Sequence, residues 1–173
     1  TMGGLTNLVI LFDGGEEDAV KDPAFLEEVK RIQTWADDQF LVAKSYSIVD
    51  ILQDLNKTFH ADDPDWYRLP DSRELTAQYL IMYESAGGTQ TDQYLSSDRS
   101  TSALELRLRL DNTSETANLL AGLEQELEER PLEQSELRVT GIGALWVKLL
   151  DYIVSSQIQG FLTAFCIIAV MMC

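Results

Sequence analysis

The pattern of hydrophobic and polar positions predicts the same order of strand, helix and strand twice along the chain. The first unit begins with the continuously apolar run 8–12, which predicts a central strand covered on both faces. Asp22 and Pro23 then predict the start of a helix, and residues 41–46 predict a second strand. This unit of about forty residues has the usual size of a strand, helix and strand motif.

The second unit has the clearer pattern. Leucines alternate with charged residues over 104–111, the period of two expected of a strand with one wet face. A helix follows, capped by Asn112 or Thr113, and residues 136–140 alternate again as a last strand. Two such units predict an α+β fold of ferredoxin-like split βαβ repeats, with a four-stranded antiparallel sheet and two helices on one face. The inward positions of the second helix are Leu119, Leu120, Leu123 and Leu127.

A helical insertion at about residues 48–94 separates the two units. Ser47, with an acidic residue three positions later, predicts a capped helix. Pro64 and Pro70 forbid its continuation, and Asp71 predicts the start of a second helix, which ends before a flexible, glycine-containing loop. The expected inner faces are Ile48, Leu52, Leu55 and Phe59 in the first helix and Leu75, Tyr79 and Met82 in the second.

Charge is distributed unevenly. The chain has 29 acidic and 13 basic residues and a formal charge of −16, and a surface of this sign repels phosphate backbones, which excludes nucleic acid as a partner. The last charged residue is Asp151, and the tail becomes almost wholly apolar from Phe161. We therefore expect a folded domain over 1–151 and the start of a transmembrane helix over 152–173, a buried core helix being the alternative.

Motifs for catalysis, metals and cofactors are missing from the sequence. The only histidine, His60, has no second imidazole and no HExxH pattern, and is best interpreted as a surface residue near a helix end. Both cysteines, Cys166 and Cys173, lie in the apolar tail, and Trp146 occupies the place of the third glycine of a dinucleotide loop. We expect no enzymatic activity, no cofactor and no metal site, and we interpret the abundant carboxylates as solvated charge.

An aromatic and methionine cluster in the insertion remains as the candidate binding surface. Such side chains offer a large, adaptable contact area to an apolar ligand. Core packing is the favoured interpretation for Tyr79 and Met82, whereas Trp66 and Tyr67 lie on the proline-bounded loop and suit either role. The candidate substrate contacts are Trp66, Tyr67, Tyr79, Met82 and Tyr83.

Three stretches of the sequence together resemble a known family. They are "MGGLTNLVILFDGG", "YSIVDILQDLNKTFHADDPDWYRLPDSRELTAQYLIMYE" and "LRVTGIGALWVKLLDYIVSSQIQGFL". The chain resembles the extracytoplasmic loop of bacterial resistance-nodulation-division (RND) exporters, in the MMPL-type branch of the mycobacterial large membrane proteins and the hopanoid exporters. The resemblance covers nearly the whole chain and implies a porter domain on the periplasmic side of the bacterial inner membrane.

The resemblance also implies a function and partners. Such an exporter is driven by protons and moves hydrophobic or amphiphilic molecules such as lipids or drugs. The implied partners are the rest of the same transporter chain, with a second porter domain and the membrane helices, together with the bilayer and the substrate. The family's proton-coupling acidic residues lie in membrane helices outside this chain. The competing hypothesis is a membrane-anchored extracytoplasmic sensor or ligand-binding module of the same fold.

Overall fold

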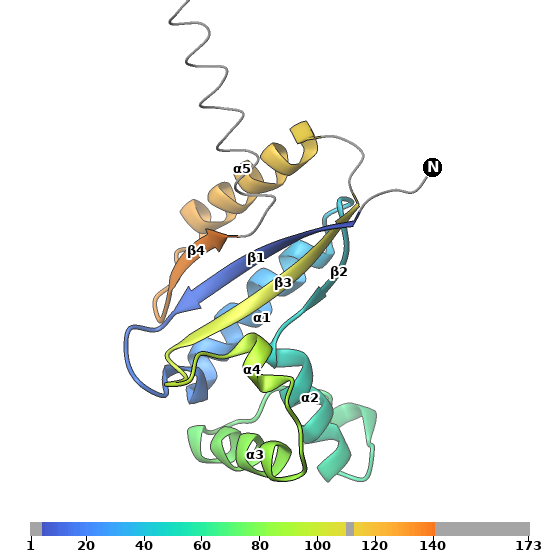
Figure 1. Cartoon of the computed structure of the whole chain (residues 1–173), viewed down its shortest axis with the longest axis vertical. Helices are drawn as coiled ribbons and strands as arrows, with labels where there is room; N and C mark the ends of the chain where they lie inside the picture. The colour runs from blue at the N-terminus through green and yellow to red at the C-terminus, as the bar shows by residue number, and fades with distance from the viewer. Residues whose placement is uncertain (1–4, 110–112, 141–173) are drawn as a thin grey trace, which may run out of the picture.

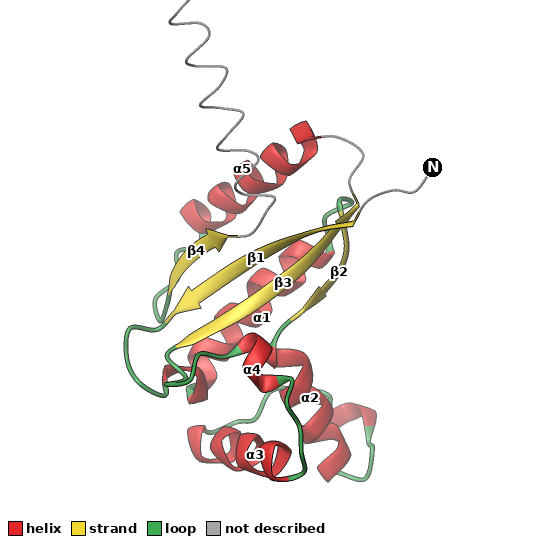
Figure 2. Cartoon of the chain, in the orientation of Figure 1, coloured by secondary structure: helices red, strands yellow, loops and turns green. Residues whose placement is uncertain are grey.

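The computed structural model describes residues 5–109 and 113–140 and shows strands and helices mixed along the chain (Figures 1 and 2). The strands are β1 (Leu5–Asp13), β2 (Val42–Tyr46), β3 (Thr101–Arg109) and β4 (Glu136–Thr140). The helices are α1 (Pro23–Asp37), α2 (Ile48–Phe59), α3 (Arg73–Ser85), α4 (Thr91–Tyr94) and α5 (Thr113–Glu129). Two short 3-10 helices are η1 (Ala19–Lys21) and η2 (Pro64–Trp66).

The four strands form one sheet in the order β2-β3-β1-β4, and every neighbouring pair is antiparallel. The described chain is therefore α+β, with a four-stranded antiparallel sheet, as the alternation predicted. β1 pairs with β3 over its full length, from Leu5 opposite Arg109 to Asp13 opposite Thr101. In β2 the register shifts between Val42 and Lys44, so that Lys44 lies opposite Arg107.

The core lies on one side of this sheet. Leu8, Ile10 and Phe12 of β1 are fully buried together with the inward leucines of β3, and they pack in one cluster with the apolar faces of α1 and α5. On the opposite face Val9 and Leu11 are only half-buried. The expectation that β1 is covered on both faces is therefore wrong, because a continuous apolar run cannot by itself distinguish a strand covered on two faces from one covered on a single face.

The predicted helix starts are confirmed in two places. The side chain of Asp22 accepts a hydrogen bond of 2.8 Å from the backbone N–H of Ala24 at the start of α1. Ser47 and Asp50 form a reciprocal capping box at the start of α2. Each pair satisfies backbone donors that the first turn of a helix leaves without a partner.

The insertion differs from the prediction in three details. Phe59 and Met82 are 46% and 48% exposed, so neither belongs to an inner face. Ser72, rather than Asp71, caps α3, because its hydroxyl accepts from the backbone N–H of Leu75. The loop after α3 contains the short helix α4, whose four residues are too few to show a hydrophobic period.

The apolar tail 152–173 and the proposed cap Asn112 lie outside the described residues. Within 5–109 and 113–140, no helix combines the length and the apolar character that crossing a bilayer requires. In Figure 1 the insertion, with α2, α3 and α4, lies at one end of the sheet.

Candidate functional site

The insertion is fastened to the rest of the fold at the start of α2. The hydroxyl of Ser47 donates to Gln33 Oε1 of α1 at 2.6 Å, and Gln33 Nε2 donates to Asp50 Oδ2 at 2.9 Å. Ser47 and Gln33 are buried, where a hydrogen bond is costly to lose. This network fixes the first turn of α2 against α1.

Asn56 is the central polar residue of the insertion. It is 2% exposed, and its side-chain amide donates to the backbone oxygen of Arg68 at 3.0 Å. Its side-chain oxygen accepts from the hydroxyl of Tyr79 at 2.9 Å, and its backbone oxygen accepts from His60 Nδ1 at 2.7 Å. One residue of α2 thus holds α3, the end of its own helix and the proline-bounded loop.

Trp66 lies in an aromatic stack on that loop. Its ring is parallel to the imidazole of His60, with the ring centroids 3.6 Å apart, and the guanidinium of Arg68 lies 4.5 Å from the indole centroid. Ala61 and Asp62, which precede the loop, have positive φ angles of 57° and 60°. His60 is the C-cap of α2, which agrees with its predicted place near a helix end.

Tyr67, the next residue, is more exposed than Trp66. It is 46% exposed. Partial burial raises the pKa of its hydroxyl above the ordinary value, and the nearby carboxylates of Asp54 and Asp50 add to the effect. Tyr67 therefore presents a phenol ring beside the acidic side of α2, where it is available for contact.

Tyr79 and Tyr83 of α3 have partners within the domain. Tyr79 is 5% exposed, its hydroxyl bonds Asn56, and its ring centroid lies 5.1 Å from that of Phe59. Tyr83 is half-buried, donates to Gln90 Oε1 at 3.2 Å and has its ring against Gly88, where no β-carbon would fit. Tyr79 thus has the core role that was favoured for it, whereas the neighbouring Met82 is exposed.

The predicted cluster is therefore divided by the structure. Trp66 joins His60 and Arg68, Tyr79 joins Phe59, and the two groups are connected through Asn56. The sequence did not predict that Phe59 and Ile81 are exposed. Phe59 follows Ile51 and Leu55 at intervals of four residues, and this spacing does not show which side of α2 other elements cover. We define the insertion surface residues as the exposed large hydrophobic side chains of this region, which are Phe59, Tyr67, Ile81 and Met82.

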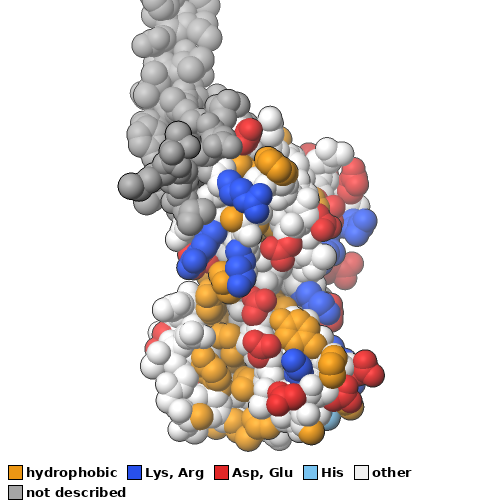
Figure 3. Space-filling view, turned by 90° about the vertical axis from the view of Figure 1, so that its right-hand side faces the viewer, with side chains coloured by type: hydrophobic (Ala, Val, Ile, Leu, Met, Phe, Trp, Pro, Cys, Tyr) orange, Lys and Arg blue, Asp and Glu red, His pale blue; other side chains and the backbone are white. Residues whose placement is uncertain are grey.

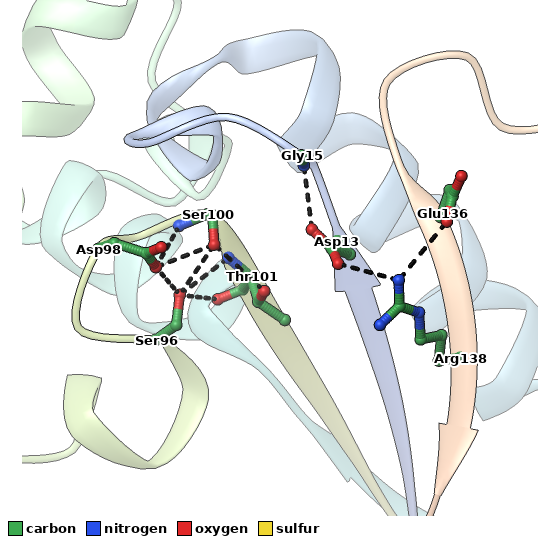
Figure 4. A network of polar contacts seen from close by, with 8 residues as sticks. All are labelled: Asp13, Gly15, Ser96, Asp98, Ser100, Thr101, Glu136 and Arg138. Atoms are coloured by element: carbon green, nitrogen blue, oxygen red, sulfur yellow. Dashed lines mark hydrogen bonds and ion pairs between the residues drawn. The ribbon is translucent and has the colours of Figure 1, made fainter.

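The described residues also line polar cavities. One of about 450 Å³ lies where β1 ends and β4 begins, and its lining includes Asp13, Gly15 and Arg138. Arg138 contacts Asp13 at 3.3 Å and Glu136 at 3.6 Å (Figure 4). A second cavity, of about 370 Å³, is lined by residues of α3, α4 and the loop that follows, namely Glu84, Thr91, Asp92, Leu95, Ser96, Ser97 and Arg99. Both are lined by carboxylates and hydroxyls and suit polar rather than apolar contents.

The loop before β3 is organised by Asp98. Its Oδ1 accepts from the hydroxyls of Ser96 and Ser100 at 2.6 and 2.9 Å and from the backbone N–H of Ser100 at 3.1 Å (Figure 4). These bonds, that from the Ser96 hydroxyl first, lower the pKa of the Asp98 carboxyl from 3.8 to about 2. Hydrogen bonds to the charged form produce a shift in this direction.

We expect Asp98→Asn to lower the free energy of unfolding at neutral pH by more than at pH 2. A carboxylate whose folded pKa is depressed stabilises the fold above its unfolded value, here 3.8, and loses that contribution as the pH falls through about 2. Urea unfolding between pH 7 and pH 2 measures the difference between the variant and the wild type. Ser96→Ala should move the carboxyl titration, followed by NMR, back toward 3.8; a wild-type midpoint already near 3.8 would contradict the assignment.

Neither a metal-binding group nor a similar protein points to a further site. Among the described residues, no group of three or more histidine, cysteine or carboxylate side chains is arranged to hold a metal ion. No protein-family model matches the chain, and no curated protein matches it. A candidate function therefore depends on the geometry above and on the motifs in the sequence.

Proposed function

We propose that the chain is the periplasmic porter domain of a proton-driven RND-type exporter of hydrophobic or amphiphilic molecules. The observation that carries the proposal is the exposure of Phe59, Tyr67, Ile81 and Met82 on a helical insertion that is otherwise tightly bonded. Large apolar side chains gathered in one region of a soluble surface are typical of a contact site. Figure 3 shows hydrophobic side chains gathered on this part of the molecule, with carboxylates among them.

The sheet supports the same proposal. The strand order β2-β3-β1-β4, with α1 between β1 and β2 and α5 between β3 and β4, is compatible with the ferredoxin-like split βαβ arrangement that porter domains have. In this arrangement the insertion between β2 and β3 extends from one end of the sheet. The domain would present the insertion to the substrate while the sheet serves as a rigid base.

The proposed mechanism is physical and uses no covalent step. Proton flow through membrane helices outside this chain would move the segment 151–160, which would act as a lever on the porter domain. The domain would then open and close a path for the substrate. The lever and the membrane helix that follows it lie outside the described residues and stay predictions.

We expect Tyr67→Ala and Met82→Ala in the intact transporter to reduce export of an apolar fluorescent dye by about fivefold or more. A minority of the residues in a contact contribute more than about 1 kcal/mol each, which corresponds to that factor, and we expect both side chains to belong to this minority. Dye efflux from whole cells, normalised to the amount of protein, measures the effect. Because both side chains are about half exposed, the thermal midpoint should change little.

Phe40→Ala is the matched control. Phe40 is 85% exposed and lies in the turn between α1 and β2, outside the insertion, so its replacement should leave export unchanged. Trp66→Ala differs from both, since it removes the stack with His60 and should lower stability as well as export. Equal loss of export in the Phe40 variant, or loss that only follows protein level, would argue against the insertion as the contact site.

A further inference from the structure

The face of the sheet opposite α1 and α5 has an uneven distribution of charge. Lys44 of β2 lies directly opposite Arg107 of β3, and Arg109 follows two positions later on the same side of β3. All three are exposed. Like charges directly opposite each other in a sheet are destabilising, so this arrangement, which we call the basic face, is unfavourable in the isolated domain.

Nearby carboxylates neutralise the basic face only in part. Within the residues that the structure describes, the carboxylates that form ion pairs do so with other cations, for example Arg31 with Glu126 and Arg99 with Glu84. Glu105, the only acidic residue of β3, lies two positions from Arg107 on the same side of the strand and accepts from the neutral amide of Asn7 at 2.7 Å, so its charge offsets one of the three positive charges. At the other edge of the sheet Arg138 is paired with two carboxylates.

The local partner of the basic face is an aromatic ring. Lys44 Nζ lies 4.4 Å from the ring centroid of Tyr46, and the guanidinium carbon of Arg107 lies 5.5 Å from it. Cation–π contacts at exposed sites contribute only about 0.5–1 kcal/mol and leave the positive charge in place. In Figure 3 basic side chains gather over the sheet portion of a protein that is otherwise strongly acidic.

The middle of this sheet face is largely apolar, with Glu105 as its one charged residue, opposite Val9. Leu11 lies opposite Ala103, and Val9 is on the same side of β1; all three are half-buried. A sheet face with an apolar centre is normally covered by another layer. Four strands span about 15 Å, which is the length of a helix of about ten residues.

We propose that the open face of the sheet binds an acidic amphipathic helix of a partner protein. The apolar stripe of the helix would cover Val9, Leu11 and Ala103, and its carboxylates would bind the basic face. A second copy of this chain fits less well, because the carboxylates at the opposite edge of its sheet face, Asp13 and Glu136, are already paired with Arg138. Carboxylates elsewhere on the domain oppose the helix only weakly, since salt screens exposed charges beyond about 8–10 Å.

The test uses the whole 173-residue chain in neutral detergent micelles. The probe is a fluorescein-labelled, fourteen-residue model helix with leucine on one face and glutamate on the other, followed by fluorescence anisotropy. The Lys44→Gln, Arg107→Gln, Arg109→Gln variant should weaken binding by about tenfold or more. The control variant Lys57→Gln, Arg73→Gln, Arg130→Gln changes the net charge equally and should weaken binding by about twofold or less. Leu11→Ser should also weaken binding while leaving its salt dependence unchanged.

Several outcomes would overturn the proposal. Wild-type protein that does not bind the probe excludes an acidic helix as the occupant. If both triple variants bind the probe equally weakly, the probe is attracted by the net charge of the protein and not by the basic face. Binding to vesicles of anionic phospholipid in place of the peptide, lost in the basic-face variant, assigns the face to a lipid surface. Circular dichroism and the thermal midpoint confirm that each variant is folded before its binding is interpreted.

Discussion

Leu106→Ala is expected to lower the free energy of unfolding by about 3 kcal/mol, within the range of about 2–5 kcal/mol found for buried leucines. Leu106 is fully buried in the centre of β3, between Leu8 of β1 and Ser45 of β2. Its removal leaves a cavity that the sheet cannot close, because β3 is held in register by β1 on one side and β2 on the other. Urea unfolding of the purified chain, followed by circular dichroism, measures the loss.

Leu11→Ala is the matched control on the other face of the same sheet. Leu11 is half-buried on the side away from α1 and α5, so the same truncation should cost about 1 kcal/mol or less. Equal costs for the two variants would mean that both faces of the sheet are covered, as the apolar run of β1 alone had predicted. The comparison therefore tests directly which face of the sheet is covered.

The elements that could be predicted from sequence are those with a long, regular pattern. β3 shows four full alternations, and its leucines Leu104, Leu106 and Leu108 are all fully buried. In α2 the predicted inner residues Ile48 and Leu52 are buried, whereas Leu55 is half-buried and Phe59 is exposed. Val49, which was not among the predicted residues, is also buried. In a helix of three turns, the spacing of apolar residues shows that one face is apolar. It does not show how much of that face a neighbouring element covers.

The candidate site was less predictable, because it depends on pairings between distant segments. Nothing in the order of residues shows that the ring of Trp66 stacks on His60, or that Met82 lies outside the contact between α3 and α2. The basic face likewise depends on the pairing of segments that are distant in the sequence. Arg107 and Arg109 were recognisable as outward residues of β3, but the shift of register that places Lys44 opposite Arg107 appears only in the folded sheet.

Asn56→Ala is expected to lower the free energy of unfolding by about 2–3 kcal/mol. The substitution leaves the buried Tyr79 hydroxyl and the part-buried backbone oxygen of Arg68 without their partner, and an unsatisfied buried group costs about 1–3 kcal/mol. The bond to His60 uses the backbone oxygen of Asn56 and survives. Thermal and urea unfolding measure the loss, and hydrogen exchange of residues 62–72 should quicken, because the loop that carries Trp66 loses its hydrogen bond to α2.

Tyr79→Phe distinguishes the effects of the two hydrogen bonds that the Asn56 side chain forms with Tyr79 and Arg68. It removes only the hydroxyl, keeps the ring against Phe59 and should cost about 1 kcal/mol, with no change in hydrogen exchange at residues 62–72. If the loop positions the contact residues, Asn56→Ala should reduce dye export beyond the loss of protein, and Tyr79→Phe should not. Equal exchange rates in both variants would mean that the backbone of the loop, with Pro64 and Pro70, is rigid without Asn56. Export in the Asn56 variant would then report only the stability of the domain.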